Sequence, residues 1–182
     1  MIPEGLKEAI TNRKALHGLS NIPESAFPDW NDLVPYFDKS FLNGNKRARD
    51  PHKIFCDVLP QDFPIVRKTM DTIGTLINSV DISSRRYSGR VSCHCYAGFS
   101  PNAKASPPHC DPMHVLFFMI QGSMPWKIFE DGCDYNDETQ AMTSKSTFSR
   151  RLVQGDFVYV PKGVYHCAIP DSSRVGFSFG WT

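Results

Sequence analysis

Two histidines and one aspartate are the residues of this chain best suited to hold a catalytic metal ion. His109 and Asp111 are separated by one residue, and on an extended strand such positions place their side chains on the same face. His166 opens a later strand-like segment, after a tight turn at Lys162 and Gly163. Two imidazoles and one carboxylate leave further coordination positions open, which is the facial arrangement typical of non-haem Fe(II). We therefore predict that His109, Asp111 and His166 bind one catalytic divalent metal, with Fe(II) as the first choice.

Each half of this pattern means little alone. Most His-x-Asp tripeptides bind nothing, and a single histidine after a Pro-Gly turn is usually a surface residue. The two halves occur here in a fixed order with strand-like segments between them, and this combination favours the metal site over the surface interpretation.

The elements that must position these residues are mostly strands. Short β-prone runs separated by turn residues follow residue 85, at 90–97, 113–121, 126–130, 157–161, 165–169 and 174–181. The segment 169–174 resembles a hairpin turn between the last two runs. Even spacing of short strands favours a sandwich or jelly roll, so we predict a mainly β fold.

The N-terminal half has a different pattern. Apolar residues spaced by three and four positions predict an amphipathic helix over roughly residues 61–79, and residues 4–16 predict a short helix. Turn signals between residues 20 and 60 predict short helices or coil. We expect residues 1–84 to form a helical and coil extension that packs on a barrel formed by residues 85–182, as one structural domain.

Composition excludes several functional classes. The net charge of +1 and the pI of about 7.6 do not indicate binding to nucleic acid or to an anionic membrane. No apolar run is long enough to span a membrane. The N-terminus lacks an apolar signal core, and the six cysteines form no CxxC pair. We interpret the cysteines as reduced thiols and expect a cytoplasmic protein.

Two stretches, PPHCDPMHVLFFMIQGSMPWKIFE and RLVQGDFVYVPKGVYHCAIPDSSRVGFSFGW, resemble the core of the JmjC/cupin-type 2-oxoglutarate oxygenases, the group that includes ribosomal oxygenases and an asparaginyl hydroxylase. The resemblance covers about residues 90–181 and implies a double-stranded β-helix, a jelly-roll fold. His109, Asp111 and His166 match the iron ligands of that family. Gly122 and Trp126 match its G-x-K-x-W motif, and the stretch from Gly155 to His166 matches its GD-x-x-Y-x-P…H motif.

One departure from the family concerns the co-substrate 2-oxoglutarate. Relatives commonly have a Lys or Arg two residues after the glycine, to pair with the distal carboxylate, and this chain has Met124 there. Arg174 is our candidate replacement, because a guanidinium binds a carboxylate bidentately; the alternative is an Arg that ends a hairpin and faces water. Lys127 is a second candidate, although it and Trp126 have opposite strand parity. Tyr96 matches a position where similar enzymes contact 2-oxoglutarate, and would otherwise be a core tyrosine.

The resemblance implies a non-haem Fe(II) and 2-oxoglutarate-dependent dioxygenase that uses O2 to hydroxylate a C–H bond. Halogenating relatives replace the carboxylate ligand with a small residue, so Asp111 favours hydroxylation or desaturation. The substrate would be a small molecule or a protein side chain. The polar segment 130–150 is expected to lie over the pocket. Neither the substrate nor the oligomeric state can be read from the sequence.

Two alternatives stay open at this point. The first is a cupin-type metalloenzyme, a dioxygenase or an isomerase, that does not use 2-oxoglutarate; Met124 favours it. The second is a non-catalytic binding module on the same jelly-roll scaffold, because a fold by itself does not determine function.

Overall fold

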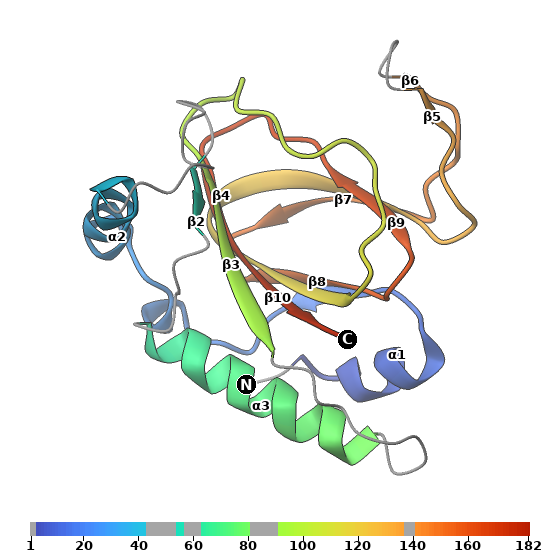
Figure 1. The fold of residues 1–182 in the computed structure, drawn as a ribbon, viewed down its shortest axis with the longest axis horizontal. Helices are drawn as coiled ribbons and strands as arrows, with labels where there is room; N and C mark the ends of the chain where they lie inside the picture. Colours follow the sequence, from blue (N-terminus) through green and yellow to red (C-terminus); the bar gives the residue numbers. More distant parts are fainter. Residues whose placement is uncertain (1–2, 43–53, 57–62, 81–90, 137–140) are drawn as a thin grey trace.

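The computed structural model describes residues 3–42, 54–56, 63–80, 91–136 and 141–182. Strands curve around a common interior, and helices lie along the outside of one sheet (Figure 1). In chain order the elements are α1 (Leu6–Asn12), β1 (Leu16–Leu19), a 3-10 helix (Glu24–Ala26), α2 (Trp30–Leu42), β2 (Ile54–Cys56), α3 (Pro64–Val80), β3 (Ser92–Gly98), β4 (His114–Phe129), β5 (Tyr135–Asn136), β6 (Ala141–Met142), β7 (Phe148–Val153), β8 (Asp156–Val160), β9 (Tyr165–Ala168) and β10 (Arg174–Trp181).

The strands form two antiparallel layers that share β4. The main sheet has the order β1-β8-β4-β10-β3-β2. The minor sheet consists of β7 and β9 on either side of the C-terminal half of β4. This is the predicted jelly roll, a double-stranded β-helix with a mainly β composition.

A bend at Gly122 carries β4 from the main sheet into the minor sheet. Gly122 has a φ of 77°, and a Cβ built there would lie 2.2 Å from the Ser173 carbonyl oxygen. Just before it, the partners of β10 jump from Met119 to Gln121, so Ile120 is an extra residue in β4. Only glycine fits this bend without strain.

The bend also reverses which residues of β4 face the interior. Before it, Val115, Phe117 and Met119 face the barrel interior, and the residues between them pack outward. After it, the inward residues are Met124, Trp126 and Ile128. The odd-numbered positions therefore give way to even-numbered ones, because the extra residue shifts the two-residue alternation of a strand by one.

The helices cover the outer face of the main sheet. Buried side chains of α1, α2 and α3 form one apolar cluster with Leu116 and Phe118 of β4 and with Val175, Phe177 and Phe179 of β10. Helix α3 runs along this face (Figure 1) and confirms the amphipathic helix predicted over 61–79. The helix predicted over 4–16 is shorter, because Arg13 adopts a left-handed conformation and ends α1.

Several details of the predicted strands were wrong. The runs at 113–121 and 126–130 are one continuous strand, β4, and not two. The segment 169–174 is not a hairpin turn: β9 pairs with β4 in the minor sheet, and β10 pairs with β4 and β3 in the main sheet, so the connection crosses from one sheet to the other. Strand β7 was missed, and its first three residues lie in the segment 130–150, which was read as a polar insertion.

The predicted division of the chain at residue 84 stays a prediction. Strands β1 and β2 come from the part read as helix and coil, and both pair with strands of the main sheet. The five cysteines whose side chains are described are free thiols. Among the described helices, none has both the length and the apolar character needed to span a membrane.

Candidate metal centre

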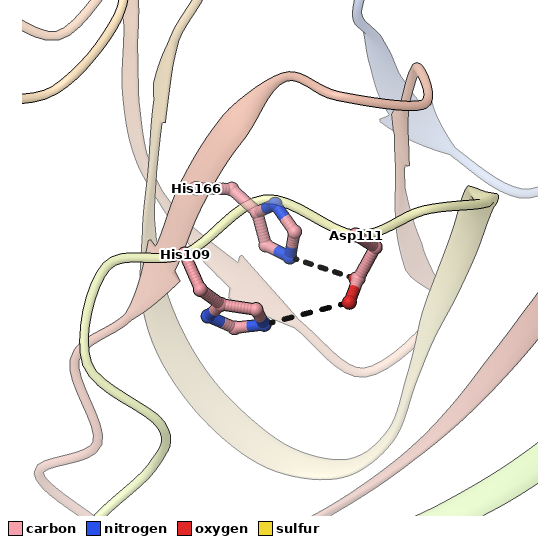
Figure 2. Close-up of side chains that lie close together, drawn as sticks. All are labelled: His109, Asp111 and His166. Atoms are coloured by element: carbon pink, nitrogen blue, oxygen red, sulfur yellow. Dashed lines mark ion pairs between the residues drawn. The ribbon is translucent and has the colours of Figure 1, made fainter.

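His109, Asp111 and His166 converge at one end of the barrel interior (Figure 2). One potential ligand atom from each residue lies within 4.8 Å of the other two. The distance from His166 Nε2 to Asp111 Oδ2 is 3.5 Å, and that from His109 Nε2 to Asp111 Oδ1 is 3.9 Å. His109 and Asp111 precede β4, and His166 belongs to β9. The structure therefore brings together the three residues that the sequence singled out.

Backbone pairing holds the two histidines side by side. His109 and His166 form an isolated antiparallel bridge, in which each N–H donates to the other's carbonyl at 3.1 and 2.9 Å. Their rings lie 4.6 Å apart between centroids. The segment around His109 is therefore not a full strand, and one bridge provides the extended geometry that the His-x-Asp spacing requires.

Two backbone carbonyls orient the imidazoles toward the centre. His109 Nδ1 lies 2.7 Å from the Pro107 carbonyl oxygen, and His166 Nδ1 lies 3.1 Å from that of Val164. A carbonyl oxygen only accepts, so each Nδ1 carries the proton and donates it. This tautomer leaves the Nε2 lone pairs free and directed at Asp111, as a metal ligand requires.

Burial favours the neutral form of one of these histidines. His166 is 4% exposed, and desolvation is the largest cause that lowers its pKa below 6.5; the nearby His109 lowers it further, whereas the hydrogen bond to Val164 and the Asp111 carboxylate oppose the shift. The indole of Trp126 stacks on the His166 ring, with centroids 5.7 Å apart and planes 6° apart. His166 is therefore held both in orientation and in the form that binds metals.

The three residues open into a cavity of about 100 Å³. Its walls are mostly apolar and include Val115, Phe117, Met124, Trp126 and Ala168. Arg174 is also part of the lining and is 5% exposed. A buried cation in an apolar cavity is unusual unless it meets an anion.

The surroundings of Arg174 hold its guanidinium without neutralising it. Nη1 donates to the Ser172 carbonyl at 3.2 Å, and Nη2 donates to the Ala103 carbonyl at 2.7 Å. Burial lowers its pKa, and the nearby Asp171 opposes this shift, but Asp171 itself pairs with Arg151. Within the described residues no carboxylate forms an ion pair with Arg174. Since a guanidinium has five N–H donors, three stay available for a ligand.

Glycines lie opposite Arg174 on both neighbouring strands, and one of them makes room for its guanidinium. Its backbone partners are Gly98 on β3 and Gly122 on β4. A Cβ at Gly98 would lie 2.6 Å from the Arg174 Nη1 atom. Both glycines are visible in the sequence, but only the strand pairing shows that they lie opposite Arg174.

Of the other two residues predicted to contact 2-oxoglutarate, one lines the cavity and one does not. Tyr96 lines the cavity together with Arg174 and the three metal-ligand candidates. Lys127 is not part of the lining, whereas its neighbour Trp126 is, because β4 alternates faces and Trp126 takes the inward one. Met124 lies buried in the cavity wall at the position where the motif has a basic residue.

Gly176 and Ser178 were not among the predicted site residues. Both line the cavity, on the same face of β10 as Arg174, while Val175, Phe177 and Phe179 face the helices. A Cβ at Gly176 would lie 2.0 Å from the Phe117 ring. Strand parity counted from Arg174 would have identified both residues.

Comparison with known families agrees with this geometry. A family model described as the JmjC domain matches residues 76–182, more than half of the chain. The chain belongs to the JmjC-domain family.

Two curated proteins resemble part of this JmjC domain. The bifunctional lysine-specific demethylase and histidyl-hydroxylase NO66 of Drosophila grimshawi is 26% identical over 95 residues, which cover 44% of this chain and 13% of that protein. Ribosomal oxygenase 2 of Bos taurus is 27% identical over 70 residues, which cover 36% of this chain and 15% of that protein. The JmjC chain thus spans only a small part of the length of these relatives.

Solved structures share the fold over nearly the whole chain. A Pseudomonas putida prolyl-4-hydroxylase superposes with a TM-score of 0.63 at 12% identity, covering 97% of this chain and 96% of that one. The Escherichia coli ribosomal oxygenase YcfD, in complex with cobalt and succinic acid, superposes with a TM-score of 0.56 at 13% identity. The match covers 99% of this chain and 51% of that one. At such identities the likeness supports the double-stranded β-helix of the JmjC domain and nothing finer.

Proposed function

We propose that this protein is a non-haem Fe(II) and 2-oxoglutarate-dependent oxygenase that hydroxylates a C–H bond. One observation carries the proposal: a cavity has His109, Asp111 and His166 in its wall together with Arg174, a buried cation without a carboxylate partner among the described residues. The names of the relatives, which include oxygenases and hydroxylases, support the same reaction class.

The donor set fits Fe(II). Two imidazoles present Nε2 atoms and Asp111 presents carboxylate oxygens, which is the two-histidine, one-carboxylate set of non-haem iron oxygenases. Iron bound by these residues would supply the activation of O2, a reaction that protein side chains do not perform. The carboxylate of Asp111 would take one coordination position of a bound iron, which favours hydroxylation or desaturation.

Arg174 is suited to bind the distal carboxylate of 2-oxoglutarate. Its spare N–H donors can grip a carboxylate in a charge-assisted pair, and its two backbone hydrogen bonds preorganise the guanidinium. The hydroxyl groups of Tyr96, Ser106 and Ser178 are further donors in the lining. The apolar walls exclude water, which strengthens these polar contacts.

A spectroscopic titration tests both parts of the proposal. Fe(II) is added to the protein without oxygen, followed by 2-oxoglutarate, and a visible metal-to-ligand charge-transfer band is expected. Arg174→Gln should retain metal binding but weaken 2-oxoglutarate binding about tenfold or more, because a hydrogen bond to a charged group contributes about 1.5–3 kcal/mol. Arg151→Gln is the matched control, since Arg151 is exposed and outside the cavity lining.

The alternative metalloenzyme without 2-oxoglutarate is favoured by one observation, the buried Met124 in place of a basic residue. A protein that binds iron at these three residues, forms no band with 2-oxoglutarate and is unchanged by Arg174→Gln would belong to that alternative. Succinate formation coupled to O2 uptake would exclude it.

A further inference from the structure

Three aromatic rings form a near-parallel cluster outside the cavity lining. His114 of β4, Tyr159 of β8 and Trp181 of β10 come from three neighbouring strands of the main sheet. The ring centroids are 6.0 Å apart for His114 and Tyr159, 5.6 Å for His114 and Trp181, and 6.0 Å for Tyr159 and Trp181, and no two planes differ by more than 17°. Tyr159 and Trp181 are fully buried in the apolar cluster that the sheet shares with the helices. The proposed oxygenase site makes no use of these rings.

The Tyr159 hydroxyl is bonded to a nitrogen atom that can take its proton. The Lys162 backbone N–H lies 3.3 Å from His114 Nδ1, and since an N–H only donates, Nδ1 carries no proton in the neutral ring. The Tyr159 hydroxyl lies 2.8 Å from the same nitrogen and therefore donates its O–H to it. Tyr159 thus has a base at hydrogen-bonding distance, which is the arrangement that proton transfer requires.

Burial makes this base decisive for the redox chemistry of Tyr159. A phenol that loses an electron becomes a strong acid, and its proton must leave if no charge is to stay on the buried ring. Tyr159 is fully buried, so bulk water cannot accept that proton, whereas His114 Nδ1 can. Trp181 has no such outlet, because its buried Nε1–H meets no hydrogen-bond acceptor among the described residues. Tyr159 is therefore the ring of this cluster best arranged to lose an electron.

The surroundings of His114 make this proton transfer reversible. Burial lowers the pKa of His114, and the cations Arg13 and Lys162 lower it further. His114 is therefore a neutral, proton-accepting ring at neutral pH. The same groups disfavour the imidazolium, so the proton returns to the Tyr159 oxygen once an electron is restored.

One turn joins the cluster to the candidate metal centre. The N–H of Lys162 donates to His114 Nδ1, and the N–H of the next residue, Gly163, donates to the Asp111 carbonyl at 3.0 Å. His114 also follows Asp111 by three positions in the chain. These links give an electron a short covalent and hydrogen-bonded route between the rings and the centre.

We propose that Tyr159 and His114 form a redox-active pair that gives one electron to an oxidised metal centre. Tyr159 loses the electron, its O–H bond breaks and an N–H bond forms at His114 Nδ1, which leaves a neutral phenoxyl radical and an imidazolium. The oxidant, reduced by one electron, is the one that arises when the centre reacts with O2 and no substrate is bound. The identity of this oxidant rests on the proposed oxygenase function, but the redox chemistry of the pair does not.

Laser flash photolysis of the metal-free protein tests the pair by itself. Photogenerated tris(bipyridine)ruthenium(III) is the one-electron oxidant, and the phenoxyl radical is followed by its visible absorption and by electron paramagnetic resonance. We expect a long-lived radical in the wild type that Tyr159→Phe removes. Tyr135→Phe is the matched control, because Tyr135 belongs to β5 and lies outside the buried cluster, and it should retain the radical. No long-lived radical in the wild type, or an equal yield in Tyr159→Phe, would overturn the proposal.

His114→Asn tests the proton transfer separately. Asparagine accepts a hydrogen bond but does not take a proton, so radical formation should be about hundredfold slower than in the wild type. In the wild type the proton moves within the pair, and the rate should not change between about pH 7 and pH 9 but should fall in D2O. In the variant the proton must reach solvent, so the rate should rise with pH. Equal rates in the two proteins, both shown to be folded by circular dichroism, would contradict the role of His114.

A freeze-quench experiment separates the pair from the proposed function. Protein loaded with Fe(II) and 2-oxoglutarate is mixed with O2 without substrate, and the phenoxyl signal should form in the wild type and be absent from Tyr159→Phe. A radical that forms with ruthenium but not with Fe(II) and O2 would overturn the electron transfer to the metal centre. Absence of the charge-transfer band would refute the proposed oxygenase function, and the ruthenium experiment would still decide whether the pair is redox-active.

Discussion

At the scale of single residues, the candidate centre depends on how its imidazoles are oriented. Pro107 and Val164 supply carbonyl oxygens that accept the Nδ1–H groups, and the Nε2 atoms of His109 and His166 therefore face Asp111. Neither of the two hydrogen bonds that orient the imidazoles involves a charged side chain. Each imidazole is therefore oriented by the backbone carbonyl two residues before it in the chain.

Removing one imidazole should weaken metal binding strongly and leave the fold unchanged. For His109→Ala we expect a loss of Co(II) affinity of about hundredfold or more, since one of three protein ligands is gone. Trp126 stacks on His166, so quenching of tryptophan fluorescence by Co(II) reports occupancy. His17→Ala is the control, because His17 is exposed and lies outside the cavity lining. Equal Co(II) affinity in the wild type and in His109→Ala would contradict the assigned ligands.

His114 lies three positions after Asp111, but hydrogen bonds occupy its Nδ1 atom, so this atom is not available to a metal ion. The Lys162 backbone N–H lies 3.3 Å from His114 Nδ1, and the Tyr159 hydroxyl lies 2.8 Å from it. Since the N–H can only donate, Nδ1 is unprotonated. Burial lowers the pKa of His114 below 6.5, and Arg13 and Lys162 lower it further.

This pKa shift predicts a loss of stability in mild acid. Below pH 6.5 the unfolded chain binds a proton at His114 that the folded protein resists, so the free energy of unfolding should fall as the pH drops from 6.5 toward the lower folded-state pKa. His114→Asn keeps an acceptor but does not titrate, and should show a shallower fall in urea denaturation between pH 7.5 and 5.5. A slope identical to that of the wild type would rule out His114 as a contributor.

At the scale of elements, the bend in β4 determines the shape of the cavity. The extra residue Ile120 and the positive φ of Gly122 reverse the parity of the strand, and this reversal turns Trp126 inward and Lys127 away from the cavity. Gly122 also pairs with Arg174, so the same bend lies beside the buried cation. A straight strand would open the interior and place other residues in its wall.

Gly122→Ala should therefore destabilise the protein more than an ordinary turn glycine. We expect a loss of about 2–4 kcal/mol, from the left-handed conformation together with the clash with the Ser173 carbonyl oxygen. Gly132→Ala is the control: it has a φ of 95° and no atom within 4 Å of the position that a Cβ would take, so only the conformational cost of about 1 kcal/mol applies. Urea denaturation measures both, and equal losses would mean that the contact with Ser173 relaxes freely.

At the scale of the whole molecule, helices and barrel share a core. The outward residues of β4 and β10 are buried against α1, α2 and α3 in one cluster, and the inward residues form a second cluster around the cavity. The main sheet therefore has apolar side chains on both faces. Loss of the helical layer would expose the outer face of the strands that carry Arg174 and flank the candidate centre.

Helix α3 provides the test of this shared core. Ile73 is fully buried against the sheet, and Ile73→Ala should cost about 2–4 kcal/mol with a single cooperative unfolding transition. The neighbouring Gly74→Ala has open space around its Cβ and should instead stabilise the protein by about 0.5–1 kcal/mol. Separate transitions of helical and strand signals in Ile73→Ala would show that the helical layer unfolds independently.

The sequence alone determined what depends on residue type and local periodicity. The choice of His109, Asp111 and His166, the mainly β fold and the helix observed at Pro64–Val80 follow from side-chain chemistry, strand alternation and helical spacing, which are properties of neighbouring positions. Only the tertiary structure decided how distant strands pair. The bulge at Ile120 shifts the parity of β4, and the segment 169–173 crosses between sheets instead of closing a hairpin. Gly98 on β3 leaves space for the guanidinium of Arg174. These features arise from contacts between residues far apart in the chain. The alternation of polar and apolar residues along one strand does not predict them.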